Sequence, residues 1–484
     1  MTKRVPASPA PGPLEDYAVC FDDLFATLAQ RQAFRRYLEG LLLPTERNKT
    51  LTALANTEPL KGAQRKEAQS LQWFLSESTW EPEVVNQRRM ELLLGDPATA
   101  PNASGALVID ETGDRKDGKA TAHVGKQWLG GIGKVENGVV SVSSLWADES
   151  VYYPLRVEPY TPAHHFAGGK RDPNFRTKPT IAFELVEKAI EKKVAFRAVV
   201  ADSLYGENLG FREDLLGAGI PYVLALGPSN VWWHPVGEPG SVEEVALASP
   251  WNGPSDPGEW VRLSRTFRNG RTEELWALEA QCGTYGPYGP EKSERLVVAT
   301  TDPTELPERT TSYLVTNLPA CGSGRARGSE LAAANLAEVV RLYTLRGWVE
   351  QSYKHIKQSL GWSQYQVRKD MAIRRHWQLV CCAFSFCWWA NVDLLQEDAP
   401  PGVILQREED ASIFPASAEE RGKKEDREQE EEEEEEPSAV VAGGAEEGQV
   451  VAGALRNAHA LLEGVYRQGP ARRATKAARR GVRG

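Results

Sequence analysis

Cysteine is scarce in this 484-residue chain, and its arrangement excludes two structural roles. The six cysteines, at positions 20, 282, 321, 381, 382 and 387, form no C-x-x-C pair, and no histidine lies at zinc-ligand spacing from them. We therefore expect reduced thiols rather than disulfides or a zinc centre, as in a protein of a reducing compartment such as the cytoplasm.

Long apolar segments are missing as well. The most apolar run, residues 379–390, has 12 residues, whereas a membrane-spanning helix needs roughly 20. We expect this run to be a buried core helix. The first 13 residues lack the apolar segment of a signal peptide. The sequence therefore favours a cytoplasmic protein with no membrane partner.

An overall excess of positive charge, the usual mark of a nucleic-acid-binding protein, is absent, because the formal net charge is -10. The acidity comes from one segment. Residues 397–436 hold 17 acidic and 5 basic side chains, and the rest of the chain holds 52 basic and 50 acidic ones. The net charge therefore does not exclude a nucleic-acid partner.

The chain begins with a segment that we expect to be helical. Residues 1–14 are rich in proline and alanine and are expected to be disordered. Apolar residues then recur at helical spacing through residues 15–96. Basic residues interrupt this pattern, so the segment is either a DNA-contacting domain or a plain helical support domain. They are Arg31, Arg35, Arg36, Arg47, Lys49, Lys61, Arg65, Lys66, Arg88 and Arg89.

From residue 105 the pattern changes to short apolar strands. We predict strands at 106–110, 139–146, 152–157, 196–201 and 222–226, with helices at 180–193 and 207–216. Three strands, a helix, a strand, a helix and a strand match the order of an RNase H-like core, in which the first and fourth strands are neighbours. We therefore assign residues 105–227 to the first part of such a mixed-sheet α/β core.

The remaining segments complete the expected architecture. Residues 228–321 are rich in proline, glycine and tryptophan and predict a β-rich insertion, with strands at 260–264, 274–279, 295–299 and 312–315. Residues 329–395 predict the C-terminal helices of the core. Residues 396–484 form an acidic and then basic tail that we expect to be disordered.

A group of glycines at 130, 131 and 133 is not followed by a helical segment. We therefore expect a tight turn between strands rather than a phosphate-binding loop. His123, His164 and His165 are open to two interpretations, as metal ligands or as ordinary structural histidines.

Two aspartates end apolar strands. Asp110 closes residues 106–110, and Asp202 follows residues 196–201. A carboxylate in this position is costly unless it is exposed at the mouth of a site or bound to a metal. Each aspartate alone is also explained as a loop-entry residue or a helix cap. Because active sites gather where the strands of α/β sheets end, neighbouring strands would bring the two together.

A third carboxylate, Glu350, lies in a later helical segment. At about 100° per residue, Tyr343, Arg346 and Lys357 fall on the same narrow stripe as Glu350. The alternative is a solvated helix face whose residues pair at i, i+4, as Arg346–Glu350 and Glu350–Lys354 would. A separate apolar seam is available to pack on the sheet, formed by Val349, Tyr353, Ile356 and Leu360.

Asp110, Asp202 and Glu350 together form a three-carboxylate set. Hard oxygen ligands of this kind suit Mg²⁺ or Mn²⁺. Two such ions, roughly 4 Å apart, would activate an attacking oxygen and stabilise a leaving one. A tyrosine, an arginine and a lysine beside the carboxylates suit a phosphodiester substrate.

These residues carry a resemblance to a known family. The strip Tyr343-x-x-Arg346-x-x-x-Glu350-x-x-x-x-x-x-Lys357 resembles the Tyr-Arg-Glu-Lys signature of DDE transposases of bacterial insertion sequences, in the cut-and-paste group. Residues 108–138, 199–208, 346–362 and 373–389 are similar to segments of insertion-sequence family seven-hundred-one. The resemblance covers roughly residues 15–395.

The resemblance implies a fold, a reaction and a set of functional residues. The fold is an RNase H-like catalytic core with a β-rich insertion between the second aspartate and the glutamate, after a helical N-terminal domain. Asp110, Asp202 and Glu350 would be the catalytic, metal-binding triad. The residues expected to position DNA phosphates are Tyr343, Arg346 and Lys357, with Lys354 beside them.

The implied reaction is metal-dependent cleavage at the ends of an insertion sequence, followed by strand transfer. Water attacks at the element's end, and the released 3′-hydroxyl attacks target DNA; in related enzymes the ends pass through a hairpin. The expected partners are double-stranded terminal inverted repeats, target DNA and a second copy of the chain. Two alternatives remain: a catalytically silent DNA-binding regulator derived from a transposase, and a nuclease on the same core without strand transfer.

Overall fold

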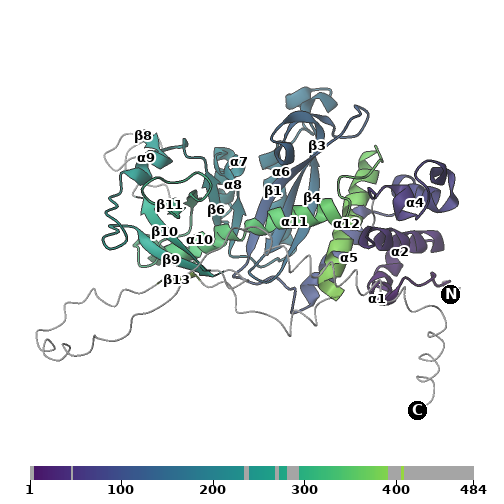
Figure 1. The fold of residues 1–484 in the computed structure, drawn as a ribbon, viewed down its shortest axis with the longest axis horizontal. Coiled ribbons are helices and arrows are strands. Elements are labelled where there is room, and N and C mark those ends of the chain that lie inside the picture. Colours follow the sequence, from purple (N-terminus) through teal and green to yellow (C-terminus); the bar gives the residue numbers. More distant parts are fainter. Residues whose placement is uncertain are drawn as a thin grey trace, which may run out of the picture.

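The computed structural model describes residues 5–44, 47–233, 239–266, 272–280, 294–390 and 405–407. This part of the chain is an elongated mixed α/β structure. The N-terminal helices lie at one end, and the strands that follow residue 231 lie at the other (Figure 1). The tail predicted at 396–484 lies outside the described residues except for 405–407.

Helices form the first part of the chain. In α2 the buried Phe34, Leu38 and Leu41 recur at helical spacing, and Thr27 begins the helix with a capping box that includes Gln30. The bounds are α1 Gly12–Val19, η1 Asp22–Leu24, α2 Leu28–Leu42, α3 Leu51–Leu54, η2 Lys61–Gln64, α4 Lys66–Ser76 and α5 Pro82–Gly95.

A mixed sheet of 11 strands runs through the described residues, in the order β13-β9-β10-β11-β12-β6-β5-β1-β3-β2, with β4 paired to β3. As predicted, the first strand is a neighbour of the strand that Asp202 follows: β1 pairs with β5, and β5 pairs with β6, both in parallel orientation. The bounds of the strands in this half are β1 Ala106–Arg115, β2 Gly125–Leu129, β3 Lys134–Ala147, β4 Tyr152–Tyr160, β5 Ala198–Ala201 and β6 Tyr222–Leu226.

Several strands differ from the prediction, and β1 and β2 differ most near the candidate residues. β1 continues five residues past Asp110, where the predicted strand ended. Residues 106–110 are all buried, and beyond them buried side chains alternate with more exposed ones, as on a strand with one face toward the core. β2 was not predicted at all, since its sequence contains glycine, lysine and glutamine rather than an apolar run. The glycines at 130, 131 and 133 form the tight turn expected between strands, and Gly133 has φ +63.

The strand-rich segment that begins after residue 228 is joined to the same sheet. β12 pairs with β6 in antiparallel orientation, and β11, β10 and β9 continue outward from it. β7 and β8 form a separate two-stranded sheet beside α9. The bounds are β7 Val231–Trp233, β8 Pro239–Ser241, α9 Val242–Leu247, β9 Val261–Thr266, β10 Thr272–Ala280, β11 Arg295–Thr300, β12 Ser312–Thr316 and β13 Leu405–Arg407.

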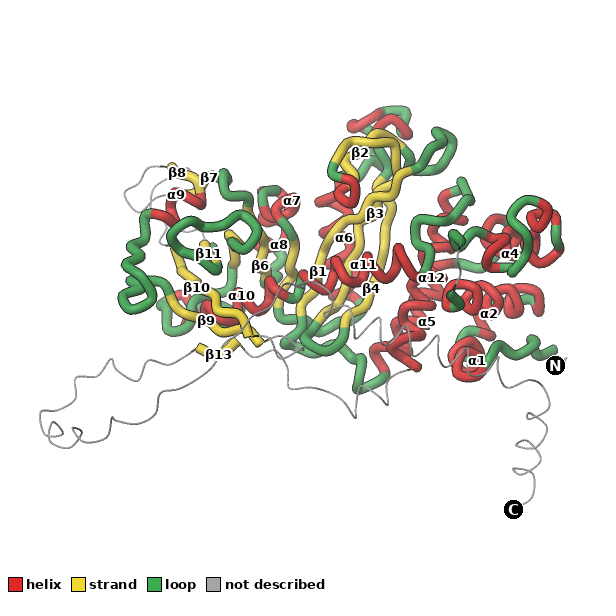
Figure 2. The backbone as a smooth tube through the Cα atoms, viewed as in Figure 1, coloured by secondary structure: helices red, strands yellow, loops and turns green. Residues whose placement is uncertain are grey.

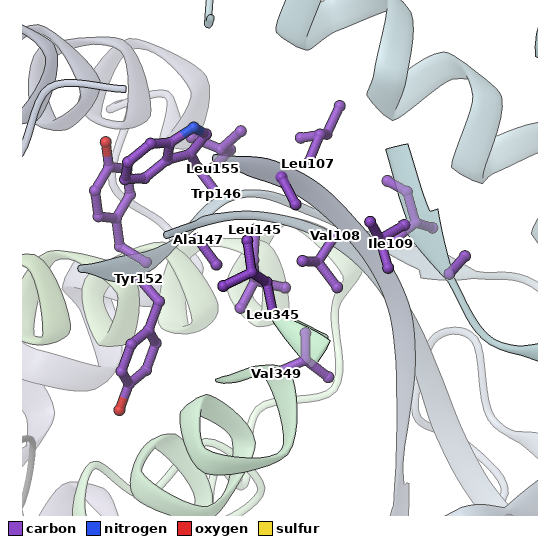
Figure 3. Packing of buried hydrophobic residues seen from close by; sticks show 14 of the residues in the cluster. Leu107, Val108, Ile109, Leu145, Trp146, Ala147, Tyr152, Leu155, Leu345 and Val349 are labelled. Carbon is purple, nitrogen blue, oxygen red and sulfur yellow. The ribbon is translucent and has the colours of Figure 1, made fainter. Parts of the chain in front are cut away.

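Helices cover both faces of the central strands. Figure 3 shows Leu345, which caps α10, and Val349, in the first turn of α11, packed beneath Val108 and Leu145. The bounds are α6 Lys178–Glu191, α7 Ser203–Gly206, α8 Leu209–Gly217, α10 Leu336–Thr344, α11 Gly347–Ser359 and α12 Asp370–Ala390. The short 3₁₀ turns outside the N-terminal part are η3 Gly130–Ile132, η4 Ala163–His165, η5 Gly169–Arg171 and η6 Arg325–Arg327.

The sequence predicts one continuous helix for the stripe of Tyr343, Arg346, Glu350 and Lys357. The structure has two helices there instead. α10 ends at Thr344 and α11 begins at Gly347. The joint is tightened by i→i−3 hydrogen bonds, from Arg346 N to the Tyr343 carbonyl (3.0 Å) and from Val349 N to the Arg346 carbonyl (2.9 Å). This turn changes the angles around the axis, so the four side chains do not keep the single stripe of an ideal helix.

Several basic residues of the N-terminal helices are structural. Arg35 is buried and pairs with Glu15 (2.8 Å) and Asp22 (2.6 Å). Arg89 is fully buried and donates to the Pro154 carbonyl of β4 (2.7 Å) and to Ser385 Oγ of α12 (3.0 Å). These side chains join helices to one another and to the sheet, so they are not available to DNA.

The apolar run at 379–390 lies in the buried α12, as predicted. In the part of the chain that the structure describes, no helix combines the length and the apolar character needed to cross a bilayer.

Candidate active site

Strand alternation directs one row of β1 side chains toward α11. Val108 lies opposite Leu145, and Asp110 lies opposite Ser143 of β3. Ser143 Oγ is 2.5 Å from the hydroxyl of Tyr353 on α11. Because side chains at i and i+2 share a face of a strand, Asp110 points toward the same helix as Val108.

Asp202 is held by the turn after β5. It is the N-cap residue of α7, and its Oδ1 accepts a hydrogen bond from Leu204 N at 3.1 Å. Gly206 ends this short helix, and a Cβ at that position would lie 1.8 Å from the Ala225 carbonyl oxygen of β6. Only glycine therefore allows α7 to lie so close to β6, which sets the position of Asp202.

The guanidinium of Arg346 lies among all three predicted carboxylates. Its nitrogens are 3.7 Å from Asp110, 3.5 Å from Asp202 and 3.7 Å from Glu350. The structure thus brings together residues from β1, the start of α7 and α11. These distances exceed the roughly 2.7–2.9 Å of a close charge-assisted hydrogen bond. Arg346 Nε is buried and has no hydrogen-bond partner among the described residues, so this arginine retains a donor for a ligand.

Burial changes the acidity of Asp110. Burial is the main cause that raises the pKa of Asp110 to about 7; Arg346 opposes this shift, and nearby Asp202 adds to it. Burial also raises the pKa of Tyr343, which Arg346 again opposes. Tyr343 therefore lies close enough to the acidic group to interact with it.

The three carboxylates have the chemistry of a site for hard divalent cations, because they supply only oxygen donors and outnumber the one guanidinium between them. As they stand, no three histidine, cysteine, aspartate or glutamate side chains in the described ranges are placed to hold a metal ion. The side chain of Glu350 is 71% exposed. The donor set therefore fits Mg²⁺ or Mn²⁺. In this conformation the guanidinium of Arg346 lies between the three carboxylates.

The two predicted lysines lie apart from Arg346. Lys357 Nζ is 2.8 Å from Asp114 Oδ1 and 3.0 Å from the Gly113 carbonyl, four and three residues beyond Asp110 on β1. Lys354 is exposed on α11. Asp114 was not singled out from the sequence, because the strand was predicted to end at residue 110. Alternation along a longer strand would have placed Asp114 on the face of Asp110.

Glu111, next to Asp110, belongs to the opposite face of the sheet. Its Oε1 is 2.5 Å from Lys178 Nζ at the start of α6, and its Oε2 accepts a hydrogen bond from the Tyr205 hydroxyl at 3.2 Å. These contacts hold the end of β1 to α6 and α7, so Glu111 supports the site without joining the carboxylate group.

The histidines considered from the sequence have structural contacts. His123 Nε2 is 2.6 Å from Asp370 Oδ1, and its Nδ1 is 2.7 Å from Thr161 Oγ1. His165 Nε2 is 2.7 Å from the Val124 carbonyl. They connect loops to neighbouring elements rather than joining the carboxylates.

Two comparisons with known proteins bear on the identity of the chain. The family model described as DDE superfamily endonuclease matches residues 20–276, which include Asp110 and Asp202 and end before Glu350. The probable transposase for insertion sequence element IS701 from Microchaete diplosiphon is 29% identical to this chain over 368 residues. That alignment covers 76% of this chain and 85% of the relative.

Proposed function

Because the chain belongs to the DDE superfamily of endonucleases and is a transposase, we propose that it cuts the ends of an insertion sequence and joins them to target DNA. The proposed catalytic residues are Asp110, Asp202 and Glu350. The observation that carries this assignment is that all three carboxylates lie within 3.7 Å of one guanidinium, although they are far apart in the chain.

The arrangement of strands supports an RNase H-like core for this chemistry. β1, β3 and β4 form an antiparallel unit, and β5 and β6 add parallel strands beside β1. Asp110 lies on β1, and Asp202 follows the neighbouring β5. Both residues therefore lie at the carboxyl end of β5, where an α/β sheet is expected to hold its site, although β1 itself continues to Arg115.

Each proposed residue has a role that depends on its position. Asp110 and Asp202 are fixed by a strand and a helix cap, so they form the rigid half of the metal site, and exposed Glu350 completes it from α11. A pair of Mg²⁺ or Mn²⁺ ions would supply Lewis-acid activation of the attacking oxygen and neutralisation of the leaving one. Arg346, with its unpartnered Nε, and Tyr343 would hold the phosphate of the bound strand.

Lys357 and Lys354 would act further along the DNA backbone. Lys354 is exposed one turn beyond Glu350, where it can contact a phosphate. Lys357 would first have to leave Asp114. The substrates proposed are the double-stranded terminal repeats and a target duplex, bound by two copies of the chain acting as a homodimer.

The test is cleavage of DNA that carries the element's terminal repeat. Wild-type protein is expected to cleave it in Mg²⁺, whereas Asp110→Asn is expected to keep DNA binding and lose cleavage to background. Asp214→Asn, an exposed aspartate on α8, is the matched control and should cleave like wild type. Cleavage by Asp110→Asn at the wild-type rate would contradict the assignment.

Two further outcomes separate the alternatives. Binding of terminal-repeat DNA without cleavage in any divalent metal would identify a silent regulator. Cleavage without joining of pre-cut 3′-hydroxyl ends to target DNA would identify a nuclease rather than a strand transferase. Integration of the pre-cut ends in Mg²⁺ is the result expected for a transposase.

A further inference from the structure

A β-hairpin extends past the strands that carry the candidate site. β1 ends at Arg115, opposite Gly138 of β3, and β3 continues to Lys134 paired only with β2. Figure 2 shows this hairpin standing at the top of the molecule, above the central strands. We call residues 126–135, which include the turn η3, the hairpin tip.

The base of this hairpin is anchored to the segment that follows α11. Lys116, directly after β1, donates from Nζ to the Ser363 carbonyl at 2.9 Å and lies 3.5 Å from the centre of the Tyr365 ring. Asn137 Nδ2 donates to the Gly118 carbonyl at 3.0 Å. These contacts fix the base of the hairpin, so the hairpin tip has a defined position relative to β1.

One face of the hairpin tip combines apolar and basic side chains that are exposed. Trp128 is 55% exposed and Val135 is 60% exposed, and the two are direct partners across the strands. Ile132, in the turn, is 47% exposed. Lys126 lies on the same strand face as Trp128 because of the period of two. Lys134, next to Val135, is exposed on the other face, and its Nζ is 3.1 Å from Glu136 Oε1. An aromatic side chain grouped with other exposed apolar residues indicates a binding surface.

The charge around this surface favours a polyanion. Residues 115–138 contain five basic and two acidic side chains, although the whole chain has a net charge of -10. The loop of residues 161–177 contains three lysines and arginines and one aspartate. This loop lies against the hairpin, since a Cβ on Gly125 would meet the His164 ring at 2.7 Å.

The position of the tip matches a duplex that leaves the candidate site. Arg115 lies five residue steps beyond Asp110 along β1, and Val135 lies three steps beyond Gly138 along β3. At about 3.3 Å per residue this path is about 26 Å long. That length corresponds to roughly 8 base pairs at about 3.4 Å each.

We propose that the hairpin tip binds the DNA duplex about 8 base pairs from the phosphate held at the carboxylates. Trp128, with Val135 beside it, packs against sugars and base edges in a groove, and Lys126 and Lys134 contact flanking phosphates. The inference rests on the proposed function, and it adds a second contact that fixes the duplex relative to the candidate site.

The test compares two lengths of terminal-repeat duplex by fluorescence anisotropy in EDTA. Trp128→Ala is expected to weaken binding of a 20-base-pair duplex roughly tenfold. The same variant should bind a duplex truncated to 6 base pairs from the cleavage end like wild type, since that duplex does not reach the tip. Leu216→Ala is the control, because Leu216 is an apolar side chain that is 39% exposed on α8, and it should bind both duplexes normally.

A second variant tests the basic residues without touching the apolar ones. Lys126→Glu combined with Lys134→Glu should also weaken binding of the long duplex selectively, and thermal melting followed by circular dichroism checks that each variant is folded. Equal effects on both duplex lengths, or no effect on either, would overturn the proposal. So would a change from dimer to monomer by Trp128→Ala in sedimentation without DNA, which would assign the surface to a second copy of the chain.

Binding in EDTA is independent of cleavage, so the two proposals fail separately. A negative result with Trp128→Ala leaves metal-dependent cleavage at Asp110 untouched. Absence of cleavage by the wild-type protein would refute the proposed reaction while leaving the contact of the hairpin tip with DNA measurable.

Discussion

At the residue scale, the position of Arg346 explains how three carboxylates can lie together in one partly buried place. Its guanidinium is 3.5–3.7 Å from Asp110, Asp202 and Glu350, so it offsets the repulsion among them. Loose distances and the unpartnered Nε mean that the arginine is not locked into one ion pair. A divalent cation would compete with it for the same oxygens.

This competition predicts the effect of removing the guanidinium. Arg346→Met should tighten Mn²⁺ binding by about tenfold, because a competing charge is lost while all three carboxylates remain. The measurement is the rise in Tm on addition of MnCl₂, without DNA. Arg197→Met removes an ion pair with Glu338 on α10 and should leave the Mn²⁺ effect unchanged. A smaller Mn²⁺ effect in Arg346→Met would show that Arg346 instead holds the carboxylates in place for the metal.

The pair of Lys357 and Asp114 supports a second prediction. Asp114 is buried, and its carboxylate is 2.8 Å from Lys357 Nζ. Lys357→Met should therefore lower the free energy of unfolding by about 1–3 kcal/mol, because a buried carboxylate loses its partner. Urea unfolding measures this change, and adding Asp114→Asn to Lys357→Met should recover part of the loss. Unchanged stability together with weaker DNA binding would mean that Lys357 binds DNA and does not stabilise the buried Asp114.

At the element scale, the packing of the short helix α7 against β6 determines where Asp202 lies. The helix has only four residues, so it is stabilised by its contacts rather than by its own hydrogen bonds. Gly206 provides the closest contact, against the Ala225 carbonyl. The placement of Asp202 thus depends on a glycine four residues away.

Gly206→Ala should lower the free energy of unfolding by about 1–3 kcal/mol, because the added methyl group meets rigid backbone and α7 must move. Mn²⁺ binding should weaken with it. Gly210→Ala on α8 is the matched control, since its Cβ would meet only Asn208 Oδ1, at 3.5 Å, and the change should leave stability equal or higher. Chemical denaturation of both variants checks the prediction, and equal stability of the two would contradict it.

At the scale of the whole molecule, the N-terminal helices and α12 share one core with the sheet. His376 of α12 is fully buried, and its Nδ1 accepts a hydrogen bond from the Tyr37 hydroxyl of α2 at 2.8 Å. Its Nε2 donates to the Gly361 and Trp362 carbonyls, each at 3.2 Å. These roles require a neutral ring, and burial lowers the pKa of His376 to about 4.

This depressed pKa predicts a loss of stability in mild acid. The unfolded chain binds the proton near pH 6.5 and the folded chain near pH 4, so the stabilisation is complete above pH 6.5 and decreases as the pH falls through that window. By pH 5 the contribution of His376 should fall by about 2 kcal/mol. Urea unfolding of wild type and His376→Gln at pH 7.5 and pH 5 measures it as a difference between the two proteins. A difference that does not change with pH would contradict the prediction.

Much of the fold could be predicted because the signals are local. The apolar run at 222–226 predicted β6 residue for residue, and the spacing of Ile181 and Leu185 predicted α6. β2 and the second half of β1 could not be predicted in this way, since their polar residues are strands only through pairing with β3. The break between α10 and α11 was missed because the helical periodicity continues across it.

The sequence by itself determined which side chains were available for chemistry: two aspartates that come after apolar strands, and a glutamate in a helix with a tyrosine, an arginine and lysines. Only the tertiary structure decided their grouping. It placed Arg346 among the carboxylates and Lys357 on Asp114, and it buried Arg35 and Arg89 among the helices. The physical reason is that residue type and spacing are properties of a short segment, whereas distance and burial depend on strands and helices that pair across the whole chain.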